Sequence, residues 1–231
     1  MAALTLLDEP VQDLHPEALV PRGGRVVLVA PHPDDEVLAL GGTLAQLAAA
    51  GREVVLYAVT DGDASHPGSA TWTPALLRAL RPVETTQALR RLGVSATVER
   101  LRFPDGAVVR HEEALARALD LHGADTVFVP WRHDGHADHE ACARAALAAA
   151  QRQGARCIEF PVWALVPGHP AHAGLPRCRM RHIRVGPRFL RAKAWAIESF
   201  RSQLMPDGDA APVLRPQALE VWRGAGEWVM A

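Results

Sequence analysis

The stretch from Arg25 to Ala50 constrains the fold of this 231-residue chain more than any other. Residues 27–30 form an unbroken apolar run of the kind typical of a buried parallel strand. The string Pro31-His32-Pro33-Asp34-Asp35-Glu36 follows, and from there apolar residues recur at helical spacing. A histidine and three carboxylates therefore stand where a strand gives way to a helix. In open α/β sheets, ligands bind at this carboxyl edge of the strands.

A second group of the same residue types lies about 100 residues further on. The string Asp134-Gly135-His136-Ala137-Asp138-His139 comes shortly after the apolar segment Thr126–Pro130. Taken alone, the first group of carboxylates could merely complement the positive end of a helix dipole. Two strand ends that each deliver histidine and aspartate favour a shared site over surface decoration.

Strand and helix patterns alternate along the chain, which predicts βαβ units and a mainly parallel sheet with helices on both faces. The predicted strands are Arg25–Ala30, Glu53–Thr60, Ala96–Arg102, Asp125–Pro130 and Arg156–Val162. The predicted helices are Glu36–Ala50, Pro74–Leu92, Glu112–Leu121, His139–Gln153 and Pro187–Phe200. Arg179–Val185 alternates like a late strand, with an antiparallel edge position as one option. We expect a single domain over residues 1–231, with an N-terminal arm over 1–24 and an irregular C-terminal tail over 203–231.

Composition limits the partners and the compartment. The formal charge of −1 gives no electrostatic case for nucleic acid or an anionic membrane surface. No apolar run approaches the roughly 20 residues that span a bilayer, so we expect no stable membrane insertion. Three cysteines without close spacing suit a reducing compartment, and the N-terminus lacks the features of a signal peptide. The cytoplasm is therefore the expected location, whereas the oligomeric state is not set by the sequence.

The best metal-ligand set is His32, Asp35 and His139. The first two are three residues apart, so they can face one point if a helix begins at this turn. Three such ligands with an open fourth position describe a catalytic zinc site, with iron(II), cobalt or manganese also compatible. His133 also lies three residues from His136, so spacing alone leaves a 133/136 ligand pair open.

The remaining polar residues of the two strings have predicted catalytic roles. Asp34 points away from the ligands and is placed to take a proton from metal-bound water as general base. His136 could stabilise an oxyanion or protonate a leaving amine. Asp138 would orient an imidazole, that of His136, by accepting its ring N–H.

These two strings resemble the two signature motifs of the PIG-L/LmbE-like zinc-dependent N-deacetylases. The string Thr60-Asp61-Gly62-Asp63, the pair Arg81 and Glu84, and the string Phe103-Pro104-Asp105-Gly106 also match that family in kind and order. The resemblance covers about residues 25–200. It implies a Rossmann-like fold and hydrolysis of the N-acetyl group of an amino sugar, usually a GlcNAc conjugate.

Carried over by motif, the resemblance assigns the metal ligands to His32, Asp35 and His139. It makes Asp34 the base and His136 the catalytic histidine, and it implies that Arg81 and Asp105 contact the substrate. Asp63 stands where many members have glutamate, and the loop 64–73 differs from the well-studied members, which leaves the substrate open. Trp163, His169 and His172 could form a sugar-binding rim, although closing a hydrophobic lid or capping a loop is the favoured interpretation.

Two alternatives accompany this hypothesis. One is hydrolysis of a different acyl amide, or of an ester, on a sugar-like scaffold. The other is a non-catalytic sugar- or metal-binding module, which would require a broken base or ligand set. The predicted base and all predicted ligands are present in the sequence, which favours the enzyme.

Overall fold

The computed structural model describes residues 13–21, 23–224 and 226–230. Within them, eight strands form one sheet in the order β1-β7-β8-β6-β5-β2-β3-β4. The strands are β1 (Asp13–Leu14), β2 (Arg25–Ala30), β3 (Glu53–Thr60), β4 (Ala96–Phe103), β5 (Thr126–Pro130), β6 (Cys157–Phe160), β7 (Met180–Ile183) and β8 (Glu227–Met230). The helices are α1 (Pro16–Leu19), α2 (Asp35–Ala49), α3 (Pro74–Leu92), α4 (Glu112–Ala118), α5 (Ala137–Gln153), α6 (Pro187–Ile197), α7 (Arg201–Leu204) and α8 (Pro216–Trp222).

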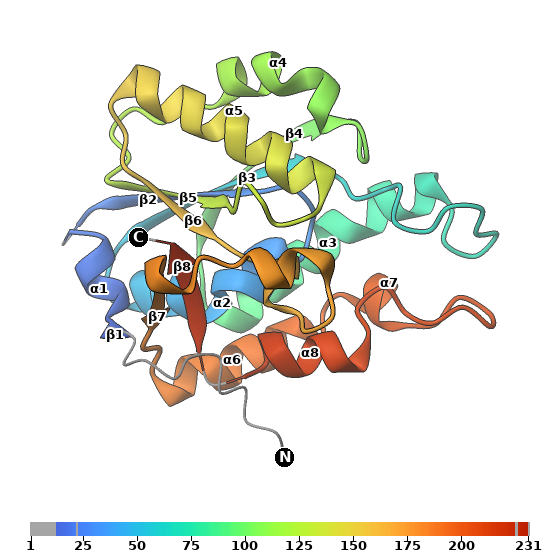
Figure 1. Ribbon diagram of the computed structural model, residues 1–231. Helices are drawn as coiled ribbons and strands as arrows, with labels where there is room; N and C mark the ends of the chain where they lie inside the picture. The colour runs from blue at the N-terminus through green and yellow to red at the C-terminus, as the bar shows by residue number, and fades with distance from the viewer. Residues whose placement is uncertain (1–12, 22, 225, 231) are drawn as a thin grey trace.

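The five strands from β6 to β4 run parallel to one another. Helices α4 and α5 cover one face of the sheet, and α2, α3 and α6 cover the other (Figure 1). Strand β2 supplies both cores: Leu28 and Ala30 face the cluster on the α2 side, whereas Val27 and Val29 face the cluster on the α5 side. The predicted α/β, Rossmann-like fold with helices on both faces is confirmed.

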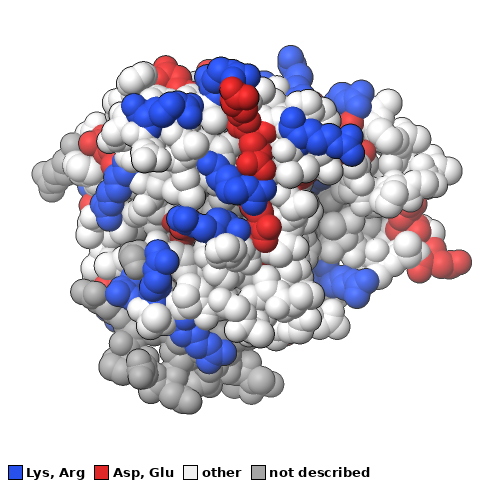
Figure 2. All heavy atoms as spheres, turned by 45° about the horizontal axis from the view of Figure 1, so that its top comes forward, with Lys and Arg blue, Asp and Glu red and all other residues white. Residues whose placement is uncertain are grey.

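The outer face of α4 and α5 carries charges of both signs. Figure 2 shows basic side chains, which are arginines here because the only lysine of the chain is the buried Lys193, interspersed with Asp and Glu side chains over this face. Two ion pairs contribute to the pattern, between Glu113 and Arg117 and between Glu112 and Arg144. Such local pairing is typical of the solvated side of an outer helix.

The late part of the chain departs from the predicted arrangement. The segment predicted as a possible antiparallel edge forms β7, which is not the edge strand, because β1 pairs with its outer side. The antiparallel strand is β8, which lies between β6 and β7 and runs opposite to both. Strand β7 consequently runs in the same direction as the parallel set. The sequence pattern of a four-residue strand is too short to reveal such an insertion.

The described parts of the two chain ends contain secondary structure that the sequence did not predict. Of the predicted arm, residues 1–12 and 22 lie outside the described residues, and the described remainder contains β1 and α1. The tail expected to be irregular over 203–231 contains α8 and β8, with Trp222 and Val229 buried in the core. Burial of these apolar side chains explains why the segment is structured. No helix among the described residues is both long and apolar enough to cross a bilayer.

Candidate metal and catalytic site

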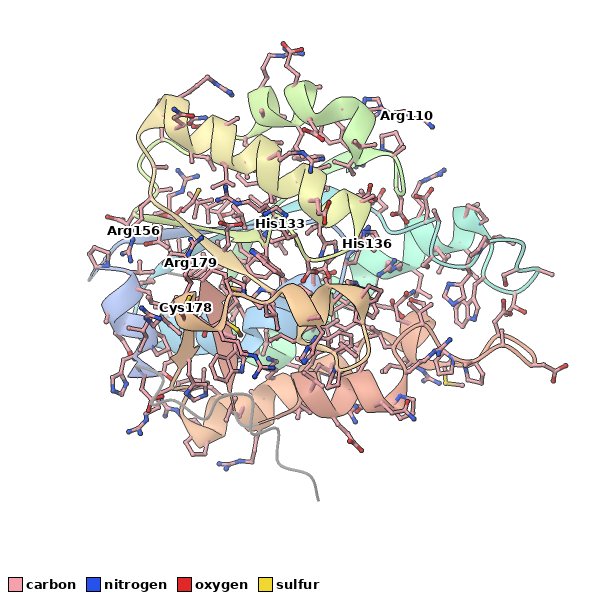
Figure 3. The ribbon with its side chains drawn as sticks, in the orientation of Figure 1. Arg110, His133, His136, Arg156, Cys178 and Arg179 are labelled. Carbon is pink, nitrogen blue, oxygen red and sulfur yellow. The ribbon has the colours of Figure 1, made fainter. Side chains whose placement is uncertain are left out.

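The two polar strings meet because their strands are neighbours in the sheet. Strand β2 pairs directly with β5, so the turn after β2 and the loop after β5 lie at the same carboxyl edge. The first turn carries His32, Asp34 and Asp35, and the second loop leads into α5. Figure 3 places His136 at the start of α5, with His133 earlier in the same loop.

Three donor atoms from the predicted ligands form a nearly equilateral triangle. His32 Nδ1 lies 3.2 Å from Asp35 Oδ2, which in turn lies 3.2 Å from His139 Nε2. The third side, from His139 Nε2 to His32 Nδ1, measures 3.3 Å. Tetrahedral ligands bound to zinc at about 2.0–2.1 Å stand roughly 3.3–3.4 Å apart. The triangle therefore has the dimensions of one face of a zinc coordination sphere.

Two looser groups of donors overlap this triangle. Donor atoms of His32, His136 and His139 lie within 4.8 Å of one another, as do those of His32, Asp105 and Asp138. We favour the triangle because all three of its sides match the spacing of ligands on one ion. His133 is exposed, and its ring packs edge-on against Trp131 with 5.6 Å between the ring centroids. Among the described residues, it belongs to neither of these donor groups.

Asp134 holds His139 in position. Its Oδ2 lies 2.9 Å from His139 Nδ1, and its carboxylate also accepts the backbone N–H groups of residues 162, 163 and 164. A carboxylate on Nδ1–H fixes the tautomer whose free Nε2 can bind a metal. The sequence predicts no role for Asp134, although this residue belongs to the second motif. The one available signal is that Asp134 lies five residues before the predicted ligand His139.

Asp138 lies beside a different imidazole from the one predicted. Its Oδ2 is 3.3 Å from His32 Nε2, and its carboxylate also accepts the N–H groups of Gly106 at 2.7 Å and Val108 at 3.0 Å. Only its backbone N–H reaches His136, donating to Nδ1 at 3.3 Å. Asp138 therefore orients His32 rather than His136, and it fastens the turn after β4 to the start of α5.

Asp34 lies at the N-cap of α2 in a strained conformation, with φ of 130°. Positive φ is uncommon for a residue with a side chain, and strained backbone conformations of this kind cluster at functional sites. Its carboxylate lies outside the donor triangle and accepts a hydrogen bond from Arg81 Nη2 at 3.0 Å. Burial raises the pKa of Asp34, and the Arg81 guanidinium opposes that rise. A carboxylate whose pKa is raised in this way is suited to proton transfer near neutral pH.

Arg81 is a buried clamp on the turns that carry the site. Its two Nη atoms donate to the carbonyl oxygens of Gly62 and Pro33, at 2.7 and 2.6 Å, as well as to Asp34. Its Nε has no partner among the described residues. Asp105 lies 3.2 Å from His32 Nε2 and accepts the N–H of Ala64 at 2.7 Å. Both residues stand at the site, and their contact with substrate remains a prediction.

His136 presents a hydrogen-bond donor to the site. Its Nδ1 accepts the N–H of Asp138, so the neutral ring carries its proton on Nε2. Burial lowers the pKa of His136 to about 4, and the neighbouring His139 and His32 add to the shift. The ring is therefore neutral near pH 7 and can donate to an oxygen that gains negative charge.

A cavity of about 290 Å³ opens over these groups. Its polar wall includes Asp34, Arg81 and Asp105, and its apolar wall includes Trp163 and Leu214. His169 and His172 are engaged in their own loop: His169 accepts the N–H of Ala171, and His172 Nδ1 lies 2.8 Å from the carbonyl oxygen of Ala164. These contacts favour a loop-closing role for the two histidines, while Trp163 faces the cavity.

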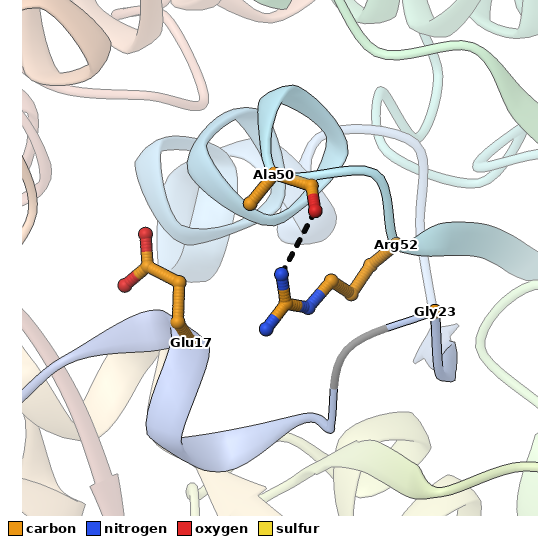
Figure 4. Close-up of a pocket in the computed structure, with 4 residues that line it drawn as sticks. All are labelled: Glu17, Gly23, Ala50 and Arg52. Carbon is orange, nitrogen blue, oxygen red and sulfur yellow. Dashed lines mark hydrogen bonds between the residues drawn. The ribbon is translucent and has the colours of Figure 1, made fainter.

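A larger cavity, of about 460 Å³, lies at the other end of the strands (Figure 4). Its lining residues Gly23 and Arg52 precede β2 and β3. The Arg52 guanidinium donates to the carbonyl oxygens of Ala50 and Val20, which satisfies it within the fold. This end of a parallel sheet carries stability rather than ligands, so the chemistry belongs to the smaller cavity.

The family model described as PIG-L: GlcNAc-PI de-N-acetylase matches residues 27–150, more than half of the chain. The chain belongs to the PIG-L family. The matched region contains every residue of the donor triangle, together with Asp34, Asp134 and His136. The PIG-L resemblance of the sequence motifs is thus confirmed.

Curated relatives match about half of the PIG-L chain. A 1D-myo-inositol 2-acetamido-2-deoxy-alpha-D-glucopyranoside deacetylase from Kineococcus radiotolerans is 36% identical over 118 residues, 47% of this chain and 32% of the relative. The 2'-N-acetylparomamine deacetylase of Streptomyces fradiae is 30% identical over 137 residues, 51% of this chain and 49% of the relative. The matches thus cover from about a third to about half of the length of these curated relatives.

A solved structure extends the likeness to the fold as a whole. A deacetylase from the teicoplanin biosynthesis pathway superposes with a TM-score of 0.67 and 22% sequence identity. The match covers 89% of this chain and 96% of that chain. It supports the PIG-L architecture beyond residue 150, where the family model ends.

Proposed function

We propose that this protein is a metal-dependent hydrolase that removes the N-acetyl group from an amino sugar of the GlcNAc type, or from its conjugate. The observation that carries the proposal is the donor triangle of His32, Asp35 and His139 beside the separate carboxylate of Asp34. The relatives named as deacetylases of acetamido sugars support this substrate class.

Zinc is the proposed metal, with iron(II) or another divalent ion as the alternative. Two imidazoles and one carboxylate suit zinc, and the sides of the triangle match its bond lengths. When bound, such an ion acidifies a water molecule and polarises an amide carbonyl. These are the two requirements for hydrolysing an unactivated acetamide.

The protein's own groups divide the proton and charge transfers between them. Asp34 accepts the proton of the attacking water, and Arg81 holds that carboxylate in place. The Nε2–H of His136 donates to the oxyanion that forms from the acetyl carbonyl. Asp34 then returns its proton to the departing amine. We propose that Arg81 and Asp105 also contact the sugar, because both line the cavity.

Two alternative functions are weighed against this proposal, and the cellular location is proposed with it. Hydrolysis of another acyl amide or of an ester on a sugar-like scaffold would use the same groups. A non-catalytic module is disfavoured, because the base and two of the proposed ligands line one cavity, and the third ligand atom, His139 Nε2, lies 3.3 Å from His32 Nδ1. The cytoplasm is the proposed location, supported by the three free cysteines.

The test is acetate release from a panel of N-acetyl glycosides, in comparison with other acyl amides and esters, with Zn²⁺ or Fe²⁺ supplied. We expect His139→Ala to lose bound metal. His136→Ala and Asp34→Ala should retain the metal, measured by elemental analysis, but turn over about 100-fold to 10,000-fold more slowly. Metal loss in His136→Ala with retention in His139→Ala would contradict the ligand assignment. Full acetate release by Asp34→Ala would contradict its role as base.

A further inference from the structure

A chain of buried polar side chains runs from α3 to the wall of the cavity. The carboxylate of Glu84 on α3 accepts both the N–H of Ser202, at 2.8 Å, and its hydroxyl, at 2.6 Å. The Nε2 of Gln203 then donates to Ser202 Oγ at 2.9 Å. Both Ser202 and Gln203 belong to α7, which packs beside α3 (Figure 1). Gln203 is only 1% exposed.

The chemistry of this chain determines which way the Gln203 amide faces. A carboxylate only accepts hydrogen bonds, so the Ser202 hydroxyl must donate its hydrogen bond to Glu84. Ser202 Oγ can then only accept from Gln203, which places the amide nitrogen, not the oxygen, on that side. The same Nε2 lies 3.4 Å from Ser65 Oγ in the loop after β3.

The amide oxygen of Gln203 is left free by this arrangement. Oε1 has no hydrogen-bond partner within the described part of the chain. Part of its surface is accessible, so the atom is not fully enclosed by the protein. Gln203 and Ser65 both line the cavity that holds Asp34 and His136. A buried amide, fixed on its nitrogen side and open on its oxygen side, is thus a rigid acceptor at the wall of the site.

We propose that Gln203 is a specificity-determining residue whose Oε1 accepts a hydrogen bond from a hydroxyl group of the sugar ring that bears the acetamide. The inference rests on the proposed deacetylation and refines its substrate class. An acceptor oxygen favours a hydroxyl and disfavours an anionic substituent, such as a phosphate, at this position. Recognition therefore includes α7, which lies outside the segment 27–150 that the family model matches.

The experiment measures KM and kcat for N-acetylglucosamine and its 3-, 4- and 6-deoxy analogues, with wild-type protein and Gln203→Met. We expect wild-type KM to rise about three- to ten-fold for one of the three deoxy analogues. Gln203→Met should raise KM by a similar factor for the parent sugar, with kcat within about two-fold. For the sensitive deoxy analogue, Gln203→Met should raise KM little further, because the hydrogen bond to Gln203 is already missing.

Matched variants separate recognition from a merely structural role. Ser202→Ala removes the anchor of the amide but keeps the acceptor, so some discrimination among the analogues should remain. Gln151→Leu, at an exposed position of α5, should leave all constants unchanged. If Gln203→Met raises KM equally for the parent sugar and all three analogues, Gln203 does not contact a hydroxyl and the proposal is wrong. Gln203→Ala repeats the test if the Met variant is unstable.

The outcome for Gln203 can be told apart from the outcome for the activity itself. If wild-type protein releases no acetate from any sugar, the proposed function fails. Binding of N-acetylglucosamine and its analogues to the zinc-loaded protein, followed by calorimetry, then tests Gln203 independently. Loss of discrimination in Gln203→Met would support the contact, whereas equal binding of all four sugars by the wild type would overturn it.

Discussion

At the scale of single residues, two carboxylates of this site, Asp134 and Asp138, each position an imidazole of the donor triangle. Asp134 accepts from His139, and Asp138 lies beside His32. Each also accepts backbone N–H groups from another loop, so each links a ligand to the fold around it. A carboxylate in this role fixes the tautomer of the ligand and raises its basicity.

Asp134→Asn is expected to weaken zinc binding by about 10- to 100-fold. The amide NH₂ would face either His139 Nδ1–H or one of the backbone N–H groups that Asp134 now accepts, so at least one donor loses its partner. Competition with a chromophoric chelator measures the affinity. Asp209→Asn, in an exposed loop, is the control and should bind zinc normally. Equal affinity of both variants would rule out the orienting role of Asp134.

At the scale of elements, the site depends on a close approach between α3 and the turn after β3. A Cβ atom on Gly62 would lie 2.0 Å from Arg81 Nη1, and this glycine has a φ of +66°. Gly62 therefore combines a left-handed backbone with the absence of a side chain. The arginine can then bridge the turns after β2 and β3 and reach Asp34.

Gly62→Ala should lower kcat by about 100-fold, because it displaces Arg81 and the carboxylate that Arg81 holds. The matched control is Gly68→Ala, at a φ of +78° with nothing within 4 Å of the added Cβ. Gly68→Ala carries the same backbone cost, of about 1 kcal/mol, without the steric clash. Acetate release and urea unfolding distinguish the two variants. Similar rates for both would mean that the approach to Arg81 is not required.

At the scale of the whole molecule, the C-terminal strand β8 is bonded to helix α2. Helix α2 is kinked at Leu40, and the N–H groups of Gly42 and Thr43 just beyond the kink donate to Glu227 of β8, each at 2.8 Å. Lys193 of α6 completes the cluster as a buried ion pair with Glu227, also at 2.8 Å. The helix whose start carries Asp34 is thus held by residues from the far end of the chain.

Glu227→Gln should destabilise the fold by about 3–5 kcal/mol, because it leaves the Lys193 charge buried without a counter-charge. Urea unfolding measures the loss. Adding Lys193→Met to this variant should recover part of the stability, since it removes the stranded charge. The control is Glu113→Gln, which breaks the exposed pair with Arg117 and should cost less than about 1 kcal/mol. A Glu227→Gln cost no larger than that of the control would contradict the account.

The sequence by itself determined the main strands and helices of the segment 25–200, and it indicated the candidate site residues. Strands such as Glu53–Thr60 and helices such as Pro74–Leu92 were predicted with the bounds that the structure has, because apolar periodicity is a local property of the chain. The sequence also indicated His32, Asp34 and Asp35 as candidate site residues, because all three come directly after one predicted strand.

Only the tertiary structure decided which residues meet. The pairing of β2 with β5 brings His139 close to His32. The packing of neighbouring loops then places the Asp138 carboxylate beside His32 and the Asp134 carboxylate beside His139. The insertion of β8 and the approach of Gln203 to the cavity likewise join segments that are distant in the chain. Short polar side chains bond whatever the fold brings within about 3 Å. Their partners therefore follow from strand order and packing, which no local pattern encodes.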